Sequence, residues 1–192
     1  AIARTHGFHA NLYVGSEIWI DASTPTSRES EVKDGVPHTV KGDLVAALAA
    51  TDVPATKILC IGAPAAVPAF TAALDAAHGA QVTLVNSEPS YLEVLPPGCC
   101  KLEAAKHLAH HLSIAIDEVM AFGDNLNDLE LLTGCGLGVA MANSHARVLA
   151  EVPTHIGHHD TDAIARFLEG FTVEDGALHR GSQSPAARRT SS

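Results

Sequence analysis

The order of hydrophobic and polar positions divides the first half of the chain, residues 1–95, into short predicted strands and helices. Apolar segments typical of strands lie at residues 12–20 (LYVGSEIWI), 57–62 (KILCIG), 81–85 and 91–95. Helices are predicted at residues 44–50 and 67–78. Residues 22–42 are polar and contain Pro25 and Gly35, so they predict a loop with at most short strands. This half is therefore expected to form a mixed α+β module.

The second half repeats strands and helices in turn. Short apolar strands are predicted at residues 119–122 (VMAF), 137–141 (LGVAM) and 154–156. Helices are predicted at residues 102–112, 126–132, 144–151 and 163–168. Alternating strands and helices are typical of a parallel sheet covered by helices, so the predicted fold class is α/β. From residue 174 the chain is rich in Gly, Ser, Pro and Arg, which predicts a disordered tail. We expect three parts: residues 1–95, 96–173 and 174–192.

The composition indicates a folded, acidic protein. Hydrophobic residues make up 46% of the 192 residues and charged residues 18%, which favours a hydrophobic core over disorder. The formal net charge of −10 argues against nucleic-acid or anionic-membrane partners, which require a basic face. No apolar run is long enough to span a bilayer. The four cysteines include no C-x-x-C pair, which predicts reduced thiols in a cytoplasmic protein.

The strongest candidate site begins where the strand at residues 119–122 ends. Gly123 and Asp124 follow this strand directly, and Asn127 and Asp128 open the next helix. Ligands of open α/β sheets bind at the carboxyl ends of strands, where Asp124 is expected. The two carboxylates are four residues apart, so on an opening helical turn they face the same way and suit Mg²⁺. The alternative is a helix cap without chemistry.

Lys101 is the second candidate. It follows Gly98-Cys99-Cys100 and opens a predicted helix at the junction of the two halves. A lysine beside a helix N-terminus is suited to hold a phosphate. Its alternative is an ordinary solvated surface charge.

Four segments together resemble the Cof-type branch of the haloacid dehalogenase (HAD) superfamily. They are SEPSYLEVLPPG at residues 87–98, Lys101, GDNLND at residues 123–128 and GLGVAMAN at residues 136–143. The resemblance extends over roughly residues 10 to 170 and preserves the family's order and spacing. It implies a partial Rossmann-like core and an α+β cap, formed by residues 1 to about 95, that closes over the substrate.

The same resemblance implies a Mg²⁺-dependent phosphatase of small phosphorylated metabolites. In this family an aspartate attacks phosphorus and forms an aspartyl-phosphate. Lys101 matches the lysine that holds the phosphate and the nucleophile. Asp124 matches the carboxylate that binds Mg²⁺, and Asp128 matches its helper, which acts directly or through water. Asn127 matches a polar residue that lines the phosphate site. Phosphoryl transfer requires positive charge close to the phosphoryl oxygens, and the resemblance implies that these residues supply or hold it.

The sequence departs from the family pattern at the nucleophile. No D-x-D-G-T segment is present, and the only D-x-D runs from Asp160 to Asp162 without a long apolar strand before it. Cys100 and Leu102 replace the usual Ser and Gly on either side of Lys101. We therefore expect this chain to be a fragment of a phosphatase that lacks the nucleophile and is inactive alone.

Two other functions remain open at this stage. The first is a natural short form of the fold that binds a ligand or partner without catalysis. The second is a histidine-based metal store, because histidines at such spacing can bind zinc. The two histidine clusters are His107, His110 and His111 on one predicted helix, and His155, His158 and His159 with Asp160.

Overall fold

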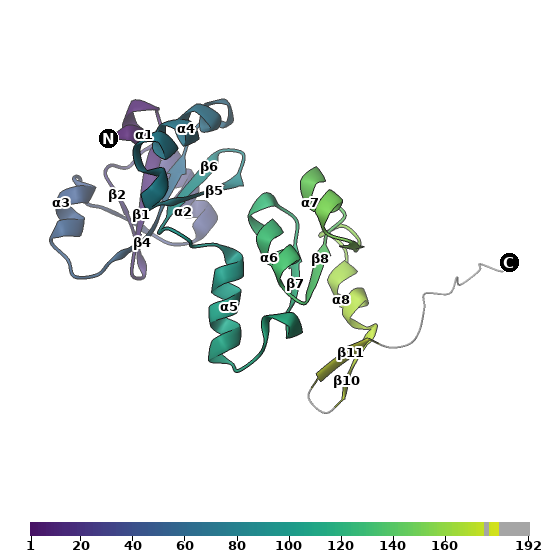
Figure 1. Cartoon of the computed structure of the whole chain (residues 1–192). Coiled ribbons are helices and arrows are strands. Elements are labelled where there is room, and N and C mark those ends of the chain that lie inside the picture. The colour runs from purple at the N-terminus through teal and green to yellow at the C-terminus, as the bar shows by residue number, and fades with distance from the viewer. Residues whose placement is uncertain (175–176, 181–192) are drawn as a thin grey trace. The chain divides into compact units, whose positions relative to one another are not determined.

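The computed structural model describes residues 1–174 and 177–180, and the chain folds into two compact units (Figure 1). The first unit is Ala1–His111 and the second is Leu112–Ser192. The sequence motifs place the boundary near Pro96 instead. The two boundaries differ in the placement of helix α5 (Lys101–His111). This helix belongs to the first compact unit, whereas the sequence motifs place it in the second half. The limits of a family cap and core within the chain stay a prediction.

A six-stranded sheet forms the centre of the first unit. Its strand order is β3-β2-β1-β4-β6-β5, and all neighbours are antiparallel except β2 and β3. The strands are β1 (His9–Val14), β2 (Glu17–Ile20), β3 (His38–Val40), β4 (Ala55–Ile61), β5 (Thr83–Glu88) and β6 (Tyr91–Leu95). The predicted mixed α+β module is confirmed, and residues 12–20 form the antiparallel hairpin β1–β2.

Apolar residues of helices α1, α3 and α4 pack against this sheet. The helices of the first unit are α1 (Ile2–Thr5), α2 (Pro25–Asp34), α3 (Leu44–Ala49), α4 (Val67–His78) and α5, with 3-10 turns η1 (Pro64–Ala66) and η2 (Gly79–Gln81). Helix α4 has the predicted bounds, and its Phe70 is fully buried and stacks on Phe8 with ring centroids 4.1 Å apart. Cys60 and Leu92 complete this core from β4 and β6.

Helix α2 corrects the loop predicted at residues 22–42. Thr24 caps its first turn by accepting a hydrogen bond from Ser27 N at 3.0 Å, and Pro25 supplies a preset helical φ. Gly35 ends the helix in the left-handed region at φ 66°, which glycine adopts without steric cost. The helix buries Ser27 and exposes Val32. It therefore carries no apolar stripe that a hydrophobic pattern could reveal.

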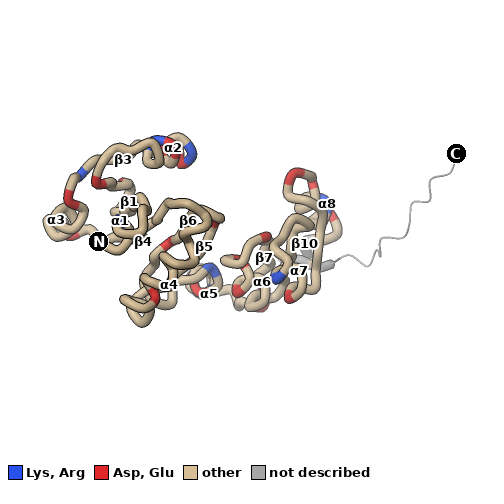
Figure 2. The backbone as a smooth tube through the Cα atoms, turned by 90° about the horizontal axis from the view of Figure 1, so that it is seen from above, with Lys and Arg blue, Asp and Glu red and all other residues tan. Residues whose placement is uncertain are grey.

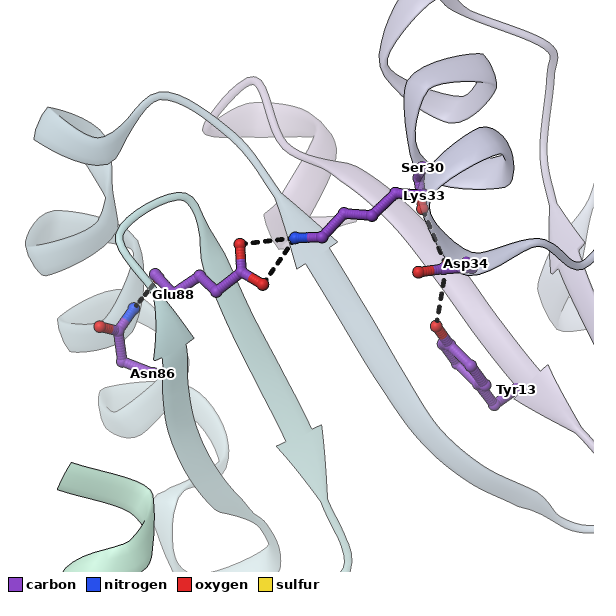
Figure 3. Close-up of polar contacts among 6 residues, drawn as sticks. All are labelled: Tyr13, Ser30, Lys33, Asp34, Asn86 and Glu88. Carbon is purple, nitrogen blue, oxygen red and sulfur yellow. Dashed lines mark hydrogen bonds and ion pairs between the residues drawn. The ribbon is translucent and has the colours of Figure 1, made fainter. Parts of the chain in front are cut away.

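Polar contacts attach α2 to the sheet (Figure 3). Lys33 Nζ donates to both carboxylate oxygens of Glu88 on β5, at 2.6 and 2.7 Å. Asp34 accepts hydrogen bonds from Tyr13 and Ser30, at 3.4 and 3.2 Å. Burial, followed by the neighbouring Asp34 carboxylate, raises the pKa of Tyr13 to about 12. Tyr13 is therefore a neutral hydrogen-bond donor throughout the physiological pH range.

The buried position of Cys60 predicts an unreactive thiol. Burial raises the pKa of Cys60 to about 11, whereas Cys99 is exposed. Since the thiolate is the nucleophile, we expect a soluble disulfide reagent to label Cys99 rapidly and Cys60 only after denaturant is added. Mass spectrometry of the labelled peptides measures both rates. Labelling of Cys60 in the native protein as fast as that of Cys99 would contradict this packing.

The second unit contains the predicted parallel sheet. Its strands are β7 (Met120–Gly123), β8 (Leu137–Ala140) and β9 (Thr154–His155), in the order β7-β8-β9 and parallel throughout. Its helices are α6 (Leu129–Gly134), α7 (Ala146–Glu151) and α8 (Ala163–Leu168), with 3-10 turns η3 (Ile116–Glu118) and η4 (Leu126–Asp128). The second unit has its own hydrophobic core, which includes the fully buried Val148 of α7 and Ala140 of β8. The α/β fold class is confirmed.

A hairpin replaces the start of the predicted disordered tail. Strand β10 (Phe171–Glu174) pairs antiparallel with β11 (Ala177–Arg180). Backbone pairing between β10 and β11 gives these residues a partner that their composition does not indicate. The rest of the predicted tail, residues 175–176 and 181–192, lies outside the described residues.

Acidic residues occur in both compact units, and the helices of the described residues are short. Figure 2 shows acidic residues in both units, and α2 carries charges of both signs. Within residues 1–174 and 177–180, none of the helices combines the length and apolarity needed to cross a membrane.

Candidate functional site

The candidate site lies where the three parallel strands of the second unit end. Asp124 follows the last residue of β7, and Asn143 stands in the turn after β8. His158 and His159 follow β9. Parallel strands present their carboxyl ends at one edge of the sheet, which is where α/β folds bind ligands. Residues far apart in sequence therefore meet at this edge.

Asp124 is held by the turn after β8. The side-chain amide of Asn143 donates to Asp124 Oδ2 at 2.8 Å, and the backbone N–H of His145 donates to the Asp124 carbonyl at 2.8 Å. Asp124 is half-buried. These contacts fix the Asp124 side chain relative to β8 while part of it stays accessible to solvent.

Asp128 holds the backbone of the same loop. Its Oδ2 accepts hydrogen bonds from the backbone N–H groups of Asp124 and Asn125, at 3.0 and 3.1 Å. The Asp128 side chain is buried, and a Cβ added to Gly123 would lie only 2.6 Å from Asp128 Cβ. Glycine is therefore required at position 123 to admit the Asp128 carboxylate behind the turn. Asp128 shapes the loop that presents Asp124.

The short η4 turn follows Asp124 and ends at Asp128. Asn125 begins it, and its Oδ1 accepts a hydrogen bond from Leu126 N at 2.8 Å. Asn127 lies within η4 and is half-buried. Asp124 precedes this turn, and Asn127 and Asp128 lie within it, so the three residues occupy one short loop. The Asp128 carboxylate, however, turns back to the backbone through Oδ2.

The chemistry of this turn fits Mg²⁺. Mg²⁺ takes oxygen ligands and commonly uses one or two carboxylates while keeping several waters. Asp124 offers a half-buried carboxylate, whereas the Asp128 carboxylate is buried and its Oδ2 is engaged by two backbone amides. The Asn143 amide donates to one Asp124 oxygen, which orients the carboxylate in the way that outer partners orient metal ligands.

Lys101 belongs to the other compact unit. It is the first residue of α5 and is exposed. The role proposed for Lys101 rests on its sequence motif.

Asn143 is the residue that the sequence analysis missed. It ends the segment at residues 136–143 that carried the family resemblance, yet no role was assigned to it. Its contact with Asp124 joins residues 19 positions apart in the chain. An asparagine in the turn that directly follows a predicted strand is the signal that was available.

The other sequence candidates are exposed. His107, His110 and His111 lie on the solvent side of α5. Asp160 and Asp162 are exposed and precede α8, and the strand before them, β9, has two residues. Within the described part of the chain, one group of three metal-ligating side chains comes together, namely His158, His159 and Asp160.

Comparison with known proteins identifies the family. A model for haloacid dehalogenase-like hydrolases matches residues 1–168. The chain belongs to the haloacid dehalogenase-like hydrolase family. An HMP-PP phosphatase of Cronobacter sakazakii is 44% identical over 92 residues, which are 47% of this chain and 34% of that protein.

Solved structures share the family fold. A haloacid dehalogenase-like hydrolase from Bacteroides thetaiotaomicron is 25% identical with a TM-score of 0.74, over 88% of this chain and 62% of that one. A haloacid dehalogenase-like hydrolase from B. subtilis is 19% identical with a TM-score of 0.76, over 87% of this chain and 66% of that one. The chain thus spans less than two thirds of the length of each of these family relatives.

Proposed function

We propose that this chain is part of a Mg²⁺-dependent phosphatase of small phosphorylated metabolites. The observation that carries the proposal is the Asp124 carboxylate, oriented by Asn143 at the carboxyl edge of a parallel sheet. Family membership and the phosphatase relatives support the same activity. The unpaired cysteines and the acidic charge favour a cytoplasmic location and argue against nucleic acid as a partner.

Each site residue has a distinct part in this proposal. Asp124 and Asp128 hold Mg²⁺, Asp128 directly or through water, and Asn127 lines the phosphate site. Mg²⁺ bound there supplies positive charge against the phosphoryl oxygens. Lys101 adds a second positive charge on the phosphate. Asp128 also keeps the loop in shape, because its Oδ2 binds the Asp124 and Asn125 amides.

The attacking carboxylate comes, in this proposal, from sequence outside these 192 residues. The family's D-x-D-G-T segment does not occur in the chain. The match covers 34% of the curated relative, which leaves room for such a segment in a longer protein. Asp160 and Asp162 remain poor candidates because they are exposed and follow a two-residue strand.

The 192-residue chain alone is expected to show no turnover of p-nitrophenyl phosphate or HMP-PP with Mg²⁺. Loss of the nucleophile removes the covalent step itself. The longer protein that includes a D-x-D-G-T segment should hydrolyse both. Phosphate release measured on the two proteins side by side tests this. Turnover by the short chain that disappears in Asp160→Asn or Asp162→Asn would refute the proposal. An inactive longer protein would favour a non-catalytic binding role.

A further inference from the structure

The loop after β9 gathers three side chains that suit a metal ion of a different kind. One ligand atom from each of His158, His159 and Asp160 lies within 4.8 Å of the others. We propose that these three residues bind a divalent transition-metal ion such as Zn²⁺ or Ni²⁺. This site uses other side chains than the Mg²⁺ site proposed at Asp124 and Asp128, and Asn143 contacts residues of both.

The distances in the loop are close to those of a metal site. His158 Nδ1 lies 3.4 Å from Asp160 Oδ2, and His159 Nε2 lies 3.1 Å from Asp160 Oδ1. Zinc bonds of about 2.0–2.1 Å in tetrahedral geometry place neighbouring ligand atoms about 3.3 Å apart. Both nitrogen–oxygen separations are close to this value, and they end on different oxygens of the Asp160 carboxylate, so one ion between the two imidazoles would engage both carboxylate oxygens or require the carboxylate to turn. The imidazole rings of His158 and His159 have centroids 4.6 Å apart, and the three ligand atoms lie within 4.8 Å of one another.

Hydrogen bonds hold the loop in place before any metal binds. The backbone N–H of His159 donates to Asn143 Oδ1 at 3.0 Å, and Ala142 N donates to the Gly157 carbonyl at 3.2 Å. The Thr161 hydroxyl donates to the His158 carbonyl at 2.7 Å. A loop that is ordered in advance loses less conformational entropy when it binds a ligand.

The ligand atoms select the type of metal. Two imidazoles and one carboxylate favour Zn²⁺, Ni²⁺ or Cu²⁺, whereas Mg²⁺ prefers oxygen ligands. The backbone N–H of Asp160 donates to His158 Nδ1 at 3.3 Å. A metal at Nδ1 takes the place of that hydrogen bond. The three side chains are exposed, so an ion reaches them directly.

Titration of the untagged 192-residue chain with Ni²⁺ at neutral pH tests the proposal. Calorimetry gives the affinity, and paramagnetic broadening of amide resonances in NMR spectra gives the location of the ion. We expect broadening centred on residues 157–161 and on Asn143. His158→Ala and His159→Ala should each weaken binding about tenfold or more while circular dichroism stays unchanged.

Two matched variants separate this site from others. His110→Ala removes a histidine of α5, and Asp124→Asn removes the proposed Mg²⁺ ligand; both should retain the Ni²⁺ affinity of the unmodified chain. Broadening centred on α5 or on Cys99–Cys100 would overturn the proposal, as would unchanged affinity in His159→Ala. Loss of Ni²⁺ binding in Asp124→Asn would assign the ion to the other site. These outcomes do not depend on phosphatase activity.

Discussion

In the proposed longer phosphatase that includes the nucleophile segment, Asp124→Asn is expected to lower kcat/KM by about a hundredfold or more. The substitution replaces a carboxylate with an amide, which is a weaker ligand for a hard cation, so extra Mg²⁺ should restore little activity. In the unmodified chain, Asn143 Nδ2 donates a hydrogen bond at 2.8 Å to a carboxylate oxygen of Asp124. The substitution replaces that charged acceptor with a neutral amide. The measurement is kcat/KM for one phosphomonoester over a series of Mg²⁺ concentrations.

Two further variants show whether the loss is specific to the site. Lys101→Ala should also reduce turnover strongly, because less positive charge then faces the phosphate. His110→Ala, on the exposed side of the same helix as Lys101, should change kcat/KM little. If His110→Ala were as damaging as Asp124→Asn, the assignment of the site to Asp124 would be wrong.

Gly138→Ala is expected to destabilise the second unit by about 3 kcal/mol or more, at the upper end of the range for overpacked cores. Gly138 is buried in the middle of β8, and a Cβ built on it would lie 1.9 Å from the carbonyl oxygen of Leu132. Leu132 belongs to α6, so relief requires a shift of the helix backbone rather than of a side chain. Urea unfolding followed by circular dichroism measures the change in free energy of unfolding.

Gly170→Ala is the matched control for this prediction. Its added Cβ would lie 3.3 Å from the Phe167 carbonyl oxygen, after the end of α8, so we expect a change of less than about 1 kcal/mol. Equal stability of Gly138→Ala and the unmodified chain would show that α6 does not pack against β8 as described.

Much of the strand and helix order of both units was predictable from the sequence because local apolar periodicity determines it. Residues 67–78 form helix α4 at the predicted bounds, and the strands predicted at residues 119–122 and 137–141 correspond to the neighbouring parallel strands β7 (Met120–Gly123) and β8 (Leu137–Ala140). The position of Asp124 was predictable for the same reason. A short apolar strand followed by Gly-Asp places the carboxylate at the strand's carboxyl end.

Helix α2 shows where this approach fails. Its local signals, Thr24 as cap and Gly35 as terminator, were present in the sequence. Its inner face is polar, however, and lies against β1. There, Asn11 Nδ2 donates a hydrogen bond to Ser30 Oγ at 2.9 Å. A helix that packs through polar contacts has no hydrophobic period, so its partner strand decides the outcome.

The sequence by itself determined the family motif, the strand that ends at Asp124 and the oxygen-rich chemistry of the turn that follows. The tertiary structure alone decided that Asn143 orients Asp124 and that Asp128 turns its carboxylate to the backbone. It also brought His158 and His159 together with Asp160, whereas sequence spacing alone made the α5 histidines an equal candidate. The physical reason is that hydrogen-bond partners are set by distance and direction in space, while a sequence pattern specifies only neighbours along one helix or strand.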